Sequence, residues 1–489
     1  MTAASPTGNS TEVSSGIDLK SVNAETKMTE TVKLKSPIDG SIYAERPVAS
    51  DAAIGATVER ARAAQVEWVA TPIAERGKYL LAMLEALVGT NDEIVTELAW
   101  QMGRPVRFGG EKGGVEERTR FMVEIAEAAL KPVPASNPKE GFRRYIKREP
   151  LGVVLVIAPW NYPYLTAVNT IVPGLMAGNA VILKHAAQTL LVGERFQAAF
   201  DKAGLPKGLF QNIVMNHAQT EKLLGSGRID HVNFTGSVAG GRAIEKAAAG
   251  TFMTVGLELG GKDPAYVLPD AKMEHAVANI VDGAFYNSGQ CCCGIERVYV
   301  HEKVYDEFVE GFIDLTKQYV VGSPLDPATT MGPMAQSRFA DLVREQKAEA
   351  LRKGAVAHIG MKVEGDRAGS PYLAPEVLTG VNHQMSVMRE ENFGPIVGIM
   401  KVRDDEEAVQ LMNDSPYGLT ASIWTTDTDR AASIGDRIET GTVFMNRCDY
   451  IDPALVWTGV KDTGKGGSMS AVGYENLTRP KSFHLREAI

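Results

Sequence analysis

Residues 153–157 read Val-Val-Leu-Val-Ile, an apolar run without a polar interruption. A continuous apolar run that is rich in β-branched residues is typical of a strand buried on both faces of a sheet. Further strand-like runs follow at residues 180–183, 210–214 and 231–234, with helical segments at residues 190–203 and 220–224 between them. This alternation predicts βαβ units, and therefore a parallel sheet with helices on its faces.

Helical and strand-like patterns continue on both sides of this region. Before it, apolar spacing predicts successive helices from Asp51 to about Trp100, ended by Gly103 and Pro105, and then a strand at residues 142–148. After it, a second α/β cycle starts near Ala276. Its predicted elements are helices at residues 276–285, 304–319, 340–351, 406–412 and 430–438 and a strand at residues 442–445. The two α/β halves are expected to meet between residues 258 and 292.

The length of 489 residues exceeds that of one compact core, so two or three domains are expected. A hydrophobic fraction of 44% and a charged fraction of 23% are typical of a globular chain. Residues 1–30, in contrast, are rich in Ser, Thr, Ala and Asn and contain no apolar run. They are predicted to form a disordered tail that carries neither a secretory signal nor a transit peptide.

The charge distribution limits the kinds of partner. A net charge of −9 without a block of Lys and Arg predicts no binding to nucleic acid or to an anionic membrane. The basic cluster at residues 143–148 is interpreted as a solvated strand face. No apolar run approaches the roughly 18 residues of a membrane-spanning helix. The 4 cysteines, 3 of them adjacent, form no disulfide framework and predict a reducing, cytoplasmic location.

A cluster of small residues follows the strand predicted at residues 231–234. It contains Gly236, Ser237, Gly240 and Gly241 and precedes a helix predicted at residues 242–249. Small residues at such a turn let backbone N–H groups and the positive end of a helix approach a pyrophosphate. Because the pattern is not GxGxxG, a tight structural turn and a cofactor loop are equally good interpretations.

Cys291, Cys292 and Cys293 lie side by side after a predicted helix. As metal ligands they are poor, because neighbouring side chains diverge and no second cysteine or histidine pair completes a tetrahedral site. They form either a buried turn of small residues or a loop that carries a thiolate nucleophile. Glu258 lies between two leucines and beside two glycines. If it is buried, its pKa is raised toward that of a general base; the alternative is an ordinary glutamate at a helix end.

These residues belong to motifs that occur in a known order. The motifs are Pro-Trp-Asn-Tyr-Pro at residues 159–163, Leu-Glu-Leu-Gly-Gly-Lys at 257–262, Gly-Gln-Cys-Cys at 289–292 and Glu-Glu-Asn-Phe-Gly-Pro at 390–395. With them the chain resembles the aldehyde dehydrogenase superfamily from about Leu34 onward. The resemblance implies an α/β fold with a Rossmann-type cofactor domain (residues 31–127 and 150–257), an α/β catalytic domain (258–460) and a small β oligomerisation arm (128–149 and 461–489). It also implies a homodimer or homotetramer.

The resemblance implies roles for individual residues. Cys292 would be the nucleophile, Glu258 the general base, and the Asn161 amide with the Cys292 backbone N–H the oxyanion hole. NAD or NADP would be the cofactor. The implied cofactor-binding residues are Trp160, Lys184, Ala187, Gly236, Ser237, Gly241, Glu391 and Phe393. The implied substrate pocket comprises Tyr162, Thr166, Asn169, Tyr286, Cys291, Cys293, Asp449, Ile451 and Trp457. No metal is implied.

Two positions depart from common family patterns. Ala187 stands where many members carry a glutamate that pairs with a ribose 2′-hydroxyl, so NADP becomes a possible cofactor beside NAD. Asn169 stands where semialdehyde members often carry arginine and betaine-aldehyde members often carry tryptophan. The expected substrate is a small aldehyde: a semialdehyde or a medium-sized aliphatic or aromatic aldehyde.

Two other functions remain as alternatives. The first is a CoA-acylating aldehyde dehydrogenase, but such members generally lack the general-base glutamate, and Glu258 is present. The second is a non-enzymatic, crystallin-like structural protein, in which the site would be expected to erode. The residues implied to be catalytic are all intact, which favours the hydrolytic enzyme.

Overall fold

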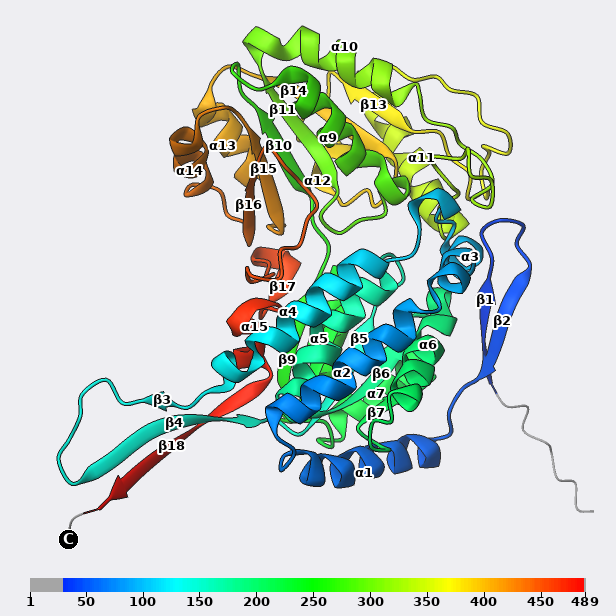
Figure 1. Cartoon of the computed structure of the whole chain (residues 1–489). Coiled ribbons are helices and arrows are strands. Elements are labelled where there is room, and N and C mark those ends of the chain that lie inside the picture. Colours follow the sequence, from blue (N-terminus) through cyan, green and yellow to red (C-terminus); the bar gives the residue numbers. More distant parts are fainter. Residues whose placement is uncertain (1–29, 488–489) are drawn as a thin grey trace, which may run out of the picture.

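The computed structural model describes residues 30–487, and the predicted tail falls outside the described residues up to residue 29. The chain forms two sheet-containing bodies with two small antiparallel sheets at the periphery (Figure 1). The predicted fold class is confirmed: a Rossmann-type α/β body, a second α/β body and a small β arm.

The first body is built on a six-stranded sheet. Its strands are β5 (Val153–Ala158), β6 (Ala180–His185), β7 (Phe210–Asn212), β8 (His231–Thr235), β9 (Thr254–Glu258) and β17 (Gly464–Lys465). Their order is β17-β9-β8-β5-β6-β7, and all neighbours are parallel except β17 with β9. The chain adds β6 and β7 on one side of β5 and then β8 and β9 on the other, so the strand order switches between β5 and β8. At such a switch point a crevice opens at the carboxyl ends of the strands.

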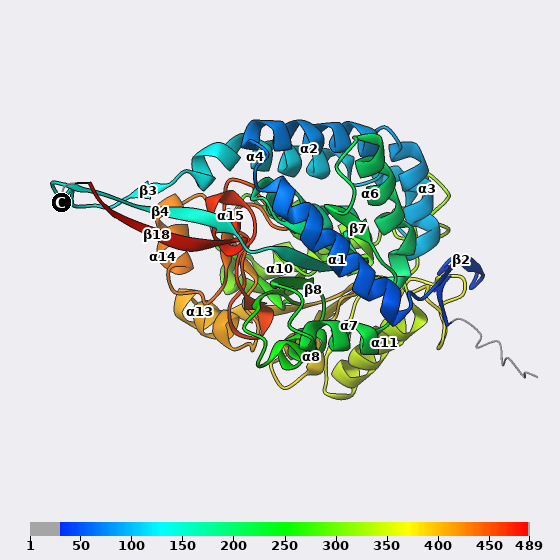
Figure 2. The ribbon, with the colours of Figure 1, turned by 90° about the horizontal axis from the view of Figure 1, so that it is seen from below.

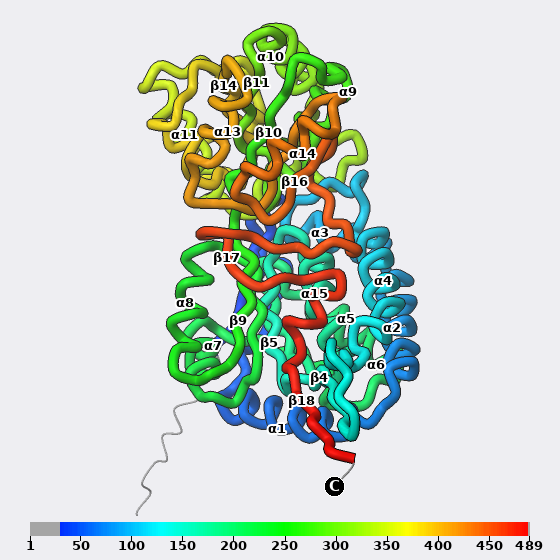
Figure 3. Tube along the Cα trace, turned by 90° about the vertical axis from the view of Figure 1, so that its left-hand side faces the viewer, coloured from blue at the N-terminus to red at the C-terminus, as the bar shows by residue number. Residues whose placement is uncertain are grey.

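Helices cover both faces of this sheet. They are α1 (Asp51–Trp68), α2 (Ile73–Val88), α3 (Asn91–Met102), α4 (Lys112–Leu130), α5 (Pro163–Met176), α6 (Leu190–Lys202), α7 (His217–Gly225), α8 (Val238–Ala248) and α15 (Ser470–Asn476). Figure 3 shows α7 and α8 on one side of β5 and β9, and α2, α4 and α5 on the other. Coverage on both faces explains why the strands are apolar throughout.

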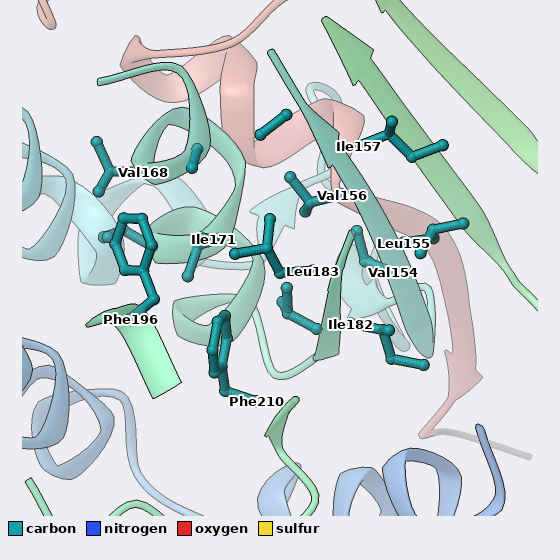
Figure 4. Packing of buried hydrophobic residues seen from close by; sticks show 14 of the residues in the cluster. Val154, Leu155, Val156, Ile157, Val168, Ile171, Ile182, Leu183, Phe196 and Phe210 are labelled. Atoms are coloured by element: carbon teal, nitrogen blue, oxygen red, sulfur yellow. The ribbon is translucent and has the colours of Figure 1, made fainter. Parts of the chain in front are cut away.

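The apolar run at residues 153–157 is strand β5, and all of its residues are buried. Figure 4 shows Val156 and Leu183 of adjacent strands packed beside Ile171 of α5, with Phe196 and Phe210 close by. Burial of such side chains contributes about 1.5–3 kcal/mol each. The prediction of a doubly buried central strand is therefore confirmed.

The second body contains a seven-stranded sheet. Its strands are β10 (Asp263–Val267), β11 (Ile295–His301), β12 (Val356–Ala357), β13 (Glu376–Thr379), β14 (Ile396–Val402), β15 (Thr420–Trp424) and β16 (Thr442–Met445), in the order β12-β13-β14-β11-β10-β15-β16. Its helices are α9 (Met273–Phe285), α10 (Tyr305–Thr316), α11 (Ser337–Arg352), α12 (Ser386–Arg389), α13 (Asp405–Asn413) and α14 (Thr428–Gly435). Only β12 runs antiparallel to its neighbour.

Two antiparallel units extend from these bodies. The arm consists of β3 (Val133–Pro134), β4 (Phe142–Pro150) and β18 (Thr478–Arg486), and it projects well beyond the helices (Figures 1 and 2). The hairpin of β1 (Thr31–Lys35) and β2 (Ile42–Pro47) packs near α3 and α6. The basic cluster expected on a solvated strand face lies on β4, where Arg143 and Lys147 are exposed and Arg144 and Arg148 are partly buried. Over residues 30–487, no helix is long and apolar enough to cross a membrane.

Periodicity missed three helices of the first body, α4, α5 and the short α15. α5 is apolar nearly all round and contains Pro173, so it shows no amphipathic stripe. α4 begins with two glycines, which disfavour a helix locally. A Cβ atom at Gly114 would lie 2.6 Å from the Leu165 side chain, so the close approach of α4 to α5 requires glycine there. In α4 and α5 tertiary packing overrides the local signal.

Candidate active site

The catalytic residues implied by the sequence lie around the carboxyl ends of neighbouring strands. Asn161 follows the end of β5, the small-residue turn at Gly236 follows β8, and Glu258 is the last residue of β9. The register places Ile157 beside Phe234 and Thr235 beside Glu258. Segments far apart in the sequence thus meet at the switch point of the sheet, where parallel α/β sheets bind ligands.

The nucleophile loop follows α9 through a short 3₁₀ segment (Tyr286–Gly289). Gly289 has φ +70°, and a Cβ atom there would lie 2.4 Å from the Gly394 carbonyl oxygen. Glycine is therefore required for the loop to pack against the segment of Glu391 and Phe393. This contact joins two of the sequence motifs across about a hundred residues of chain.

Only the middle thiol of the cysteine triplet is accessible. The Cys291 and Cys293 sulfurs lie 3.5 Å apart, and these residues are 8% and 4% exposed. Cys292 is only half-buried. Hydrogen bonds from the Cys292 and Cys293 thiols lower the pKa of Cys291, and donating those bonds raises the pKa of the other two. The thiols therefore affect one another's ionisation, and Cys292 is the one of the three that a molecule from outside the protein can reach.

Two N–H donors adjoin the nucleophile. The Asn161 Nδ2 donates to the Gln290 carbonyl at 3.3 Å, which places this amide against the nucleophile loop and leaves its second hydrogen unused. Within residues 30–487, the Cys292 backbone N–H has no hydrogen-bond acceptor. Unpaired donors beside an electrophile are what an oxyanion requires.

A buried ion pair holds Asn161 in place. Arg104 donates to the Asn161 carbonyl at 2.6 Å and to Glu111 at 2.7 Å, and both ionic side chains are 3% exposed. Asn287 also donates to the Asn161 carbonyl, at 3.2 Å. Neither Arg104 nor Glu111 was among the expected site residues, since no local pattern marks a pair that acts through a backbone carbonyl.

Glu258 accepts two hydrogen bonds inside the protein. Ser468 donates to it at 2.7 Å and Thr235 at 3.2 Å. Burial raises the pKa of Glu258, and these two hydrogen bonds oppose that rise. Ser468 is itself fixed by two backbone hydrogen bonds of 2.9 Å with Trp457. A carboxylate with a raised pKa that still ionises is suited to accept a proton near neutral pH.

Substitution of Ser468 by alanine is expected to move the acid limb of the pH–kcat profile to higher pH. The lost hydrogen bond favours the ionised form of Glu258, so its removal raises the pKa of the carboxyl group. A bond to a charged group contributes about 1.5–3 kcal/mol, which corresponds to a shift of about one pH unit or more. Thr235→Val, which removes the longer bond, serves as the graded comparison. A profile that stays in place in both variants would contradict this role.

Several of the residues implied to bind a cofactor lie at the same edge of the sheet, near the carboxyl ends of β6 and β8. Lys184 ends β6 next to Ile157, and burial lowers the pKa of its ammonium group. Ser237 caps α8, accepting from the Gly240 N–H at 3.2 Å. The helix therefore begins at Val238, four residues earlier than the expected start at residue 242, and its N-terminus points its N–H groups at the turn. A Cβ atom at Gly241 would lie 2.7 Å from the Leu259 side chain.

A second group of cofactor residues comes from the other body. Glu391 accepts from the Gly261 N–H at 3.2 Å, and burial raises its pKa to about 8. Trp160 stacks on Phe339 at 5.4 Å and meets the Phe393 ring edge-on at 5.6 Å. Phe339 was not expected from the sequence. Together with the N-terminus of α8, these aromatic and carboxylate groups fit the ring, hydroxyl and phosphate groups of a dinucleotide.

The segment that carries Glu391 and Phe393 is anchored by a buried charge cluster. Lys262 donates to Glu296 at 2.8 Å and to the Asn392 side chain at 2.7 Å. Glu296 in turn accepts from the backbone N–H groups of Asn392 and Phe393 at 2.8 and 2.9 Å. Lys262 belongs to a sequence motif, but its role as an anchor between strands depends on the packing of the second sheet.

The residues of the expected substrate pocket make aromatic, charged and apolar contacts. The Arg104 guanidinium lies 5.0 Å from the Tyr162 ring centroid, and Tyr286 meets Phe108 edge-on at 4.9 Å. Burial raises the pKa of Asp449 to about 7. Thr166 donates to the Tyr162 carbonyl at 2.8 Å, and Asn169 accepts from Arg118 at 3.0 Å. Trp160 and Tyr162 belong to the same hydrophobic cluster as Cys291, Cys292, Cys293, Ile451 and Trp457.

A cavity of about 930 Å³ lies away from the nucleophile. It is bordered by the turn of the β1–β2 hairpin, by Ala187 and by residues 335–338. Ala187 begins a 3₁₀ segment (Ala187–Thr189) between β6 and α6. None of the expected catalytic residues lines this cavity, so its size does not locate the chemistry.

Comparisons with known proteins agree with this geometry. Residues 23–483 match the model of the "Aldehyde dehydrogenase family". The chain is 36% identical to an "Aldehyde dehydrogenase" of Paenarthrobacter nicotinovorans, over 87% of this chain and 93% of that protein. It is 32% identical to a "Succinate-semialdehyde dehydrogenase [NADP(+)]" of Mycobacterium avium, over 92% and 96%. The solved structure of PnpE in complex with nicotinamide adenine dinucleotide is similar with a TM-score of 0.89 and 30% identity, over 94% of this chain and 95% of that one.

Proposed function

Since the chain belongs to the aldehyde dehydrogenase family, whose members use NAD or NADP, we propose that it oxidises an aldehyde to a carboxylic acid by hydrolysis of a Cys292 thioester. The observation that carries this proposal is the placement of one accessible thiol beside free N–H donors of Asn161 and of its own backbone, with a buried carboxylate, Glu258, at the same carboxyl edge of the sheet as Asn161. These are the parts that covalent acyl transfer needs.

The first step is attack by the Cys292 thiolate on the aldehyde carbon. The carbonyl oxygen becomes an oxyanion, and the Asn161 amide and the Cys292 backbone N–H stabilise it. Arg104 contributes indirectly, because its hydrogen bond to the Asn161 carbonyl holds that residue at the loop. Preorganised donors of this kind contribute about 3–4 kcal/mol each to a transition state.

The nicotinamide cofactor, when bound, supplies the hydride acceptor that turns the tetrahedral adduct into a thioester. Trp160 and Phe393 would contact its ring and ribose, Glu391 and Lys184 its ribose hydroxyls, and the turn of Gly236 and Ser237 its pyrophosphate. The raised pKa of Glu391 and the lowered pKa of Lys184 both follow from burial, and contact with hydroxyl groups compensates part of that burial.

Hydrolysis releases the acid. Glu258 takes a proton from a water molecule, the resulting hydroxide adds to the thioester carbonyl, and the Cys292 thiolate leaves. Ser468 and Thr235 orient the carboxylate for this task. In the alternative, CoA-acylating reaction, a thiol of CoA would replace water and no base for water would be required. The buried, doubly hydrogen-bonded Glu258 favours hydrolysis.

The proposal is tested with purified protein, NAD⁺ or NADP⁺, and a panel of aliphatic, aromatic and ω-carboxylated aldehydes. Formation of reduced cofactor together with stoichiometric free acid is expected. Acyl-CoA formation that depends on added CoA would instead favour the acylating reaction. Absence of aldehyde-dependent cofactor reduction across the whole panel would contradict the proposed function and leave the structural, crystallin-like role.

Ala187→Glu is expected to lower the preference for NADP over NAD. A carboxylate at this position would repel a 2′-phosphate but accept a hydrogen bond from a 2′-hydroxyl. Since a like-charge contact costs several kcal/mol, the ratio of kcat/KM for NADP⁺ to that for NAD⁺ should fall about tenfold or more. Ala187→Gln adds the same bulk without charge. Equal changes in the two variants would show that size, rather than charge, acts here.

We also propose that the arm pairs two copies of the chain into a homodimer or homotetramer. β4 and β18 form a long ribbon that projects from the body (Figure 2). An exposed strand edge is a ready site for pairing with another sheet. The proposed division into a cofactor domain, a catalytic domain and this arm keeps the boundaries predicted from the sequence, and sedimentation analysis of an arm-deleted protein would test it.

A further inference from the structure

Glu391 carries a carboxyl group that the protein surrounds closely but supports with few hydrogen bonds. A Cβ atom at Gly260 would lie 2.3 Å from both carboxyl oxygens, so the group packs against the backbone there. Among residues 30–487, only the Gly261 N–H donates to these oxygens, at 3.2 Å. An ionised carboxylate can accept about four hydrogen bonds. The protein alone therefore leaves the ionised form of Glu391 poorly stabilised.

The nearest charges also oppose ionisation of Glu391. Glu296 on β11 is 4% exposed, and Asp263, the first residue of β10, is 1% exposed. Burial, and then the charge of Glu296, raises the pKa of Glu391 to about 8. Lys262 acts in the opposite direction, but it is already paired with Glu296 at 2.8 Å. The Arg297 guanidinium donates instead to the Lys262 backbone carbonyl at 2.8 Å and to two backbone carbonyls of α13.

Two further neighbours of Glu391 carry no charge. Gln346 of α11 donates to the Glu391 backbone carbonyl at 3.5 Å. Tyr417, in the loop before β15, is neutral around pH 7, because burial and then the charge of Glu391 raise its pKa to about 12. Neither side chain supplies the positive charge that would favour an ionised Glu391.

Glu296 is fixed in position by the chain segment that carries Glu391. The backbone N–H groups of Asn392 and Phe393 donate to its two carboxylate oxygens at 2.8 and 2.9 Å. Phe393 has φ +46°, in the left-handed region that bulky residues seldom adopt, so the turn depends on these bonds. The negative charge of Glu296 is therefore held next to Glu391 as a permanent part of this site.

A bound cofactor would change the balance at Glu391. In the proposed function, this carboxyl group accepts hydrogen bonds from ribose hydroxyl groups. Hydroxyl donors stabilise an ionised carboxylate more than a neutral carboxyl group. The positive charge of an oxidised nicotinamide ring acts in the same direction. Free and occupied protein thus favour different protonation states of one side chain.

We infer that binding of the oxidised cofactor drives a proton from Glu391 into the solvent, and that Glu296 sets the pH range in which this occurs. The inference rests on the proposed function, from which it takes the contact between Glu391 and the ribose. Below about pH 8 the free protein holds the proton, so binding must release it; at higher pH the proton is already gone. The affinity should therefore rise with pH, by up to about tenfold per pH unit, and level off above about pH 8.

The test counts protons during cofactor binding in the absence of aldehyde. Calorimetric titration with NAD⁺ and with NADP⁺ at pH 7, repeated in buffers of different ionisation enthalpy, gives the number of protons released per site. The wild-type protein should release about one proton more than Glu391→Gln, which keeps the shape of the side chain but does not titrate. Comparison with the same cofactor cancels protons from other groups, such as the Cys292 thiol or the 2′-phosphate of NADP⁺.

Glu296→Gln tests the origin of the effect. The variant removes the fixed negative charge and leaves Lys262 without its counterion, so Glu391 should already be ionised in much of the free protein at pH 7. Proton release should fall to less than about half, and the pH at which the Kd levels off should drop by about one unit or more. Glu345→Gln, at an exposed position next to Gln346 on α11, is the matched control and should behave as the wild type.

Three results would overturn the inference. They are equal proton release in the wild type and Glu391→Gln, a Kd of the wild type that is constant between pH 6 and pH 8, and unchanged release in Glu296→Gln. Thermal unfolding shows whether each variant is folded. If Glu296→Gln is not, Lys262→Met gives the opposite test: without the cation, the pH at which the Kd levels off should rise.

The outcomes separate this inference from the proposed function. If the protein oxidises an aldehyde but binds the cofactor without releasing a proton from Glu391, the proposed function stands and the inference fails. If the proton is released but no aldehyde of the panel is oxidised, the inference stands and the proposed function fails.

Discussion

Cys292→Ala is expected to reduce the rate of aldehyde-dependent cofactor reduction by about 10⁴-fold or more, since the variant has no nucleophile at the only accessible position of the triplet. The change removes a single half-buried sulfur atom, so the fold should be unaffected. The measurement is kcat with a saturating aldehyde, followed by detection of a covalent acyl adduct in the wild type by intact-protein mass spectrometry. No adduct should form in the variant.

The neighbouring thiols provide the controls for this experiment. Cys291→Ala and Cys293→Ala alter the pocket wall but keep the nucleophile, so both should retain activity within about tenfold of the wild type. Their loss also removes hydrogen bonds within the coupled thiol group, which should shift the pH profile. Equal, complete losses in all three variants would contradict the assignment of Cys292 and indicate a shared structural role.

Glu258→Gln is the second variant with a large expected effect. Glutamine keeps the shape and can accept a hydrogen bond from one of the two hydroxyls while its NH2 donates to the other, but it cannot accept a proton from water. Loss of a general base lowers turnover by about 10²–10⁴-fold. Because acylation precedes this step, the variant should show a rapid burst of reduced cofactor, of about one equivalent per active site, before the slow steady state. Stopped-flow absorbance measures both phases.

A matched control is Glu245→Gln, on the surface of α8, where the side chain is 46% exposed. This variant should behave as the wild type. If Glu258→Gln removes the burst together with the steady state, then Glu258 acts before the thioester forms, for example in forming the thiolate. An unchanged rate would exclude Glu258 as the base. In the wild type, activity should fall as the pH drops through the raised pKa of Glu258, because only the ionised form accepts a proton.

Strands and helices with a periodic or continuously apolar pattern were predicted correctly from the sequence. Strand β5 was predicted because five consecutive apolar residues have no stable place outside a doubly covered sheet. Strand β16 was predicted at residues 442–445, as observed. The predicted ends of helices were less accurate. The helix predicted at residues 304–319 ends at Thr316, and the helix predicted at residues 430–438 ends at Gly435. Terminal residues depend on caps and contacts more than on periodicity.

The site was predicted through motifs, but its supporting residues were not. Ser468 was not among the expected site residues, although it makes the shorter hydrogen bond to Glu258. Arg104, Glu111 and Arg118 carry no recognisable motif at all. Their hydrogen bonds form because α4 and the loop before it pack against α5, where Gly114 lies beside the Leu165 side chain. The partners of these bonds are more than fifty residues away in the sequence.

The sequence by itself determined the α/β class and the central buried strand, because each is encoded in a short contiguous pattern, and its motifs marked the residues proposed as nucleophile, base and oxyanion donor. Only the tertiary structure decided which cysteine is accessible and what holds Glu258 and Asn161. These properties depend on burial and on partners from distant segments. Desolvation and hydrogen bonding act through space, and the order of residues along the chain does not reveal them.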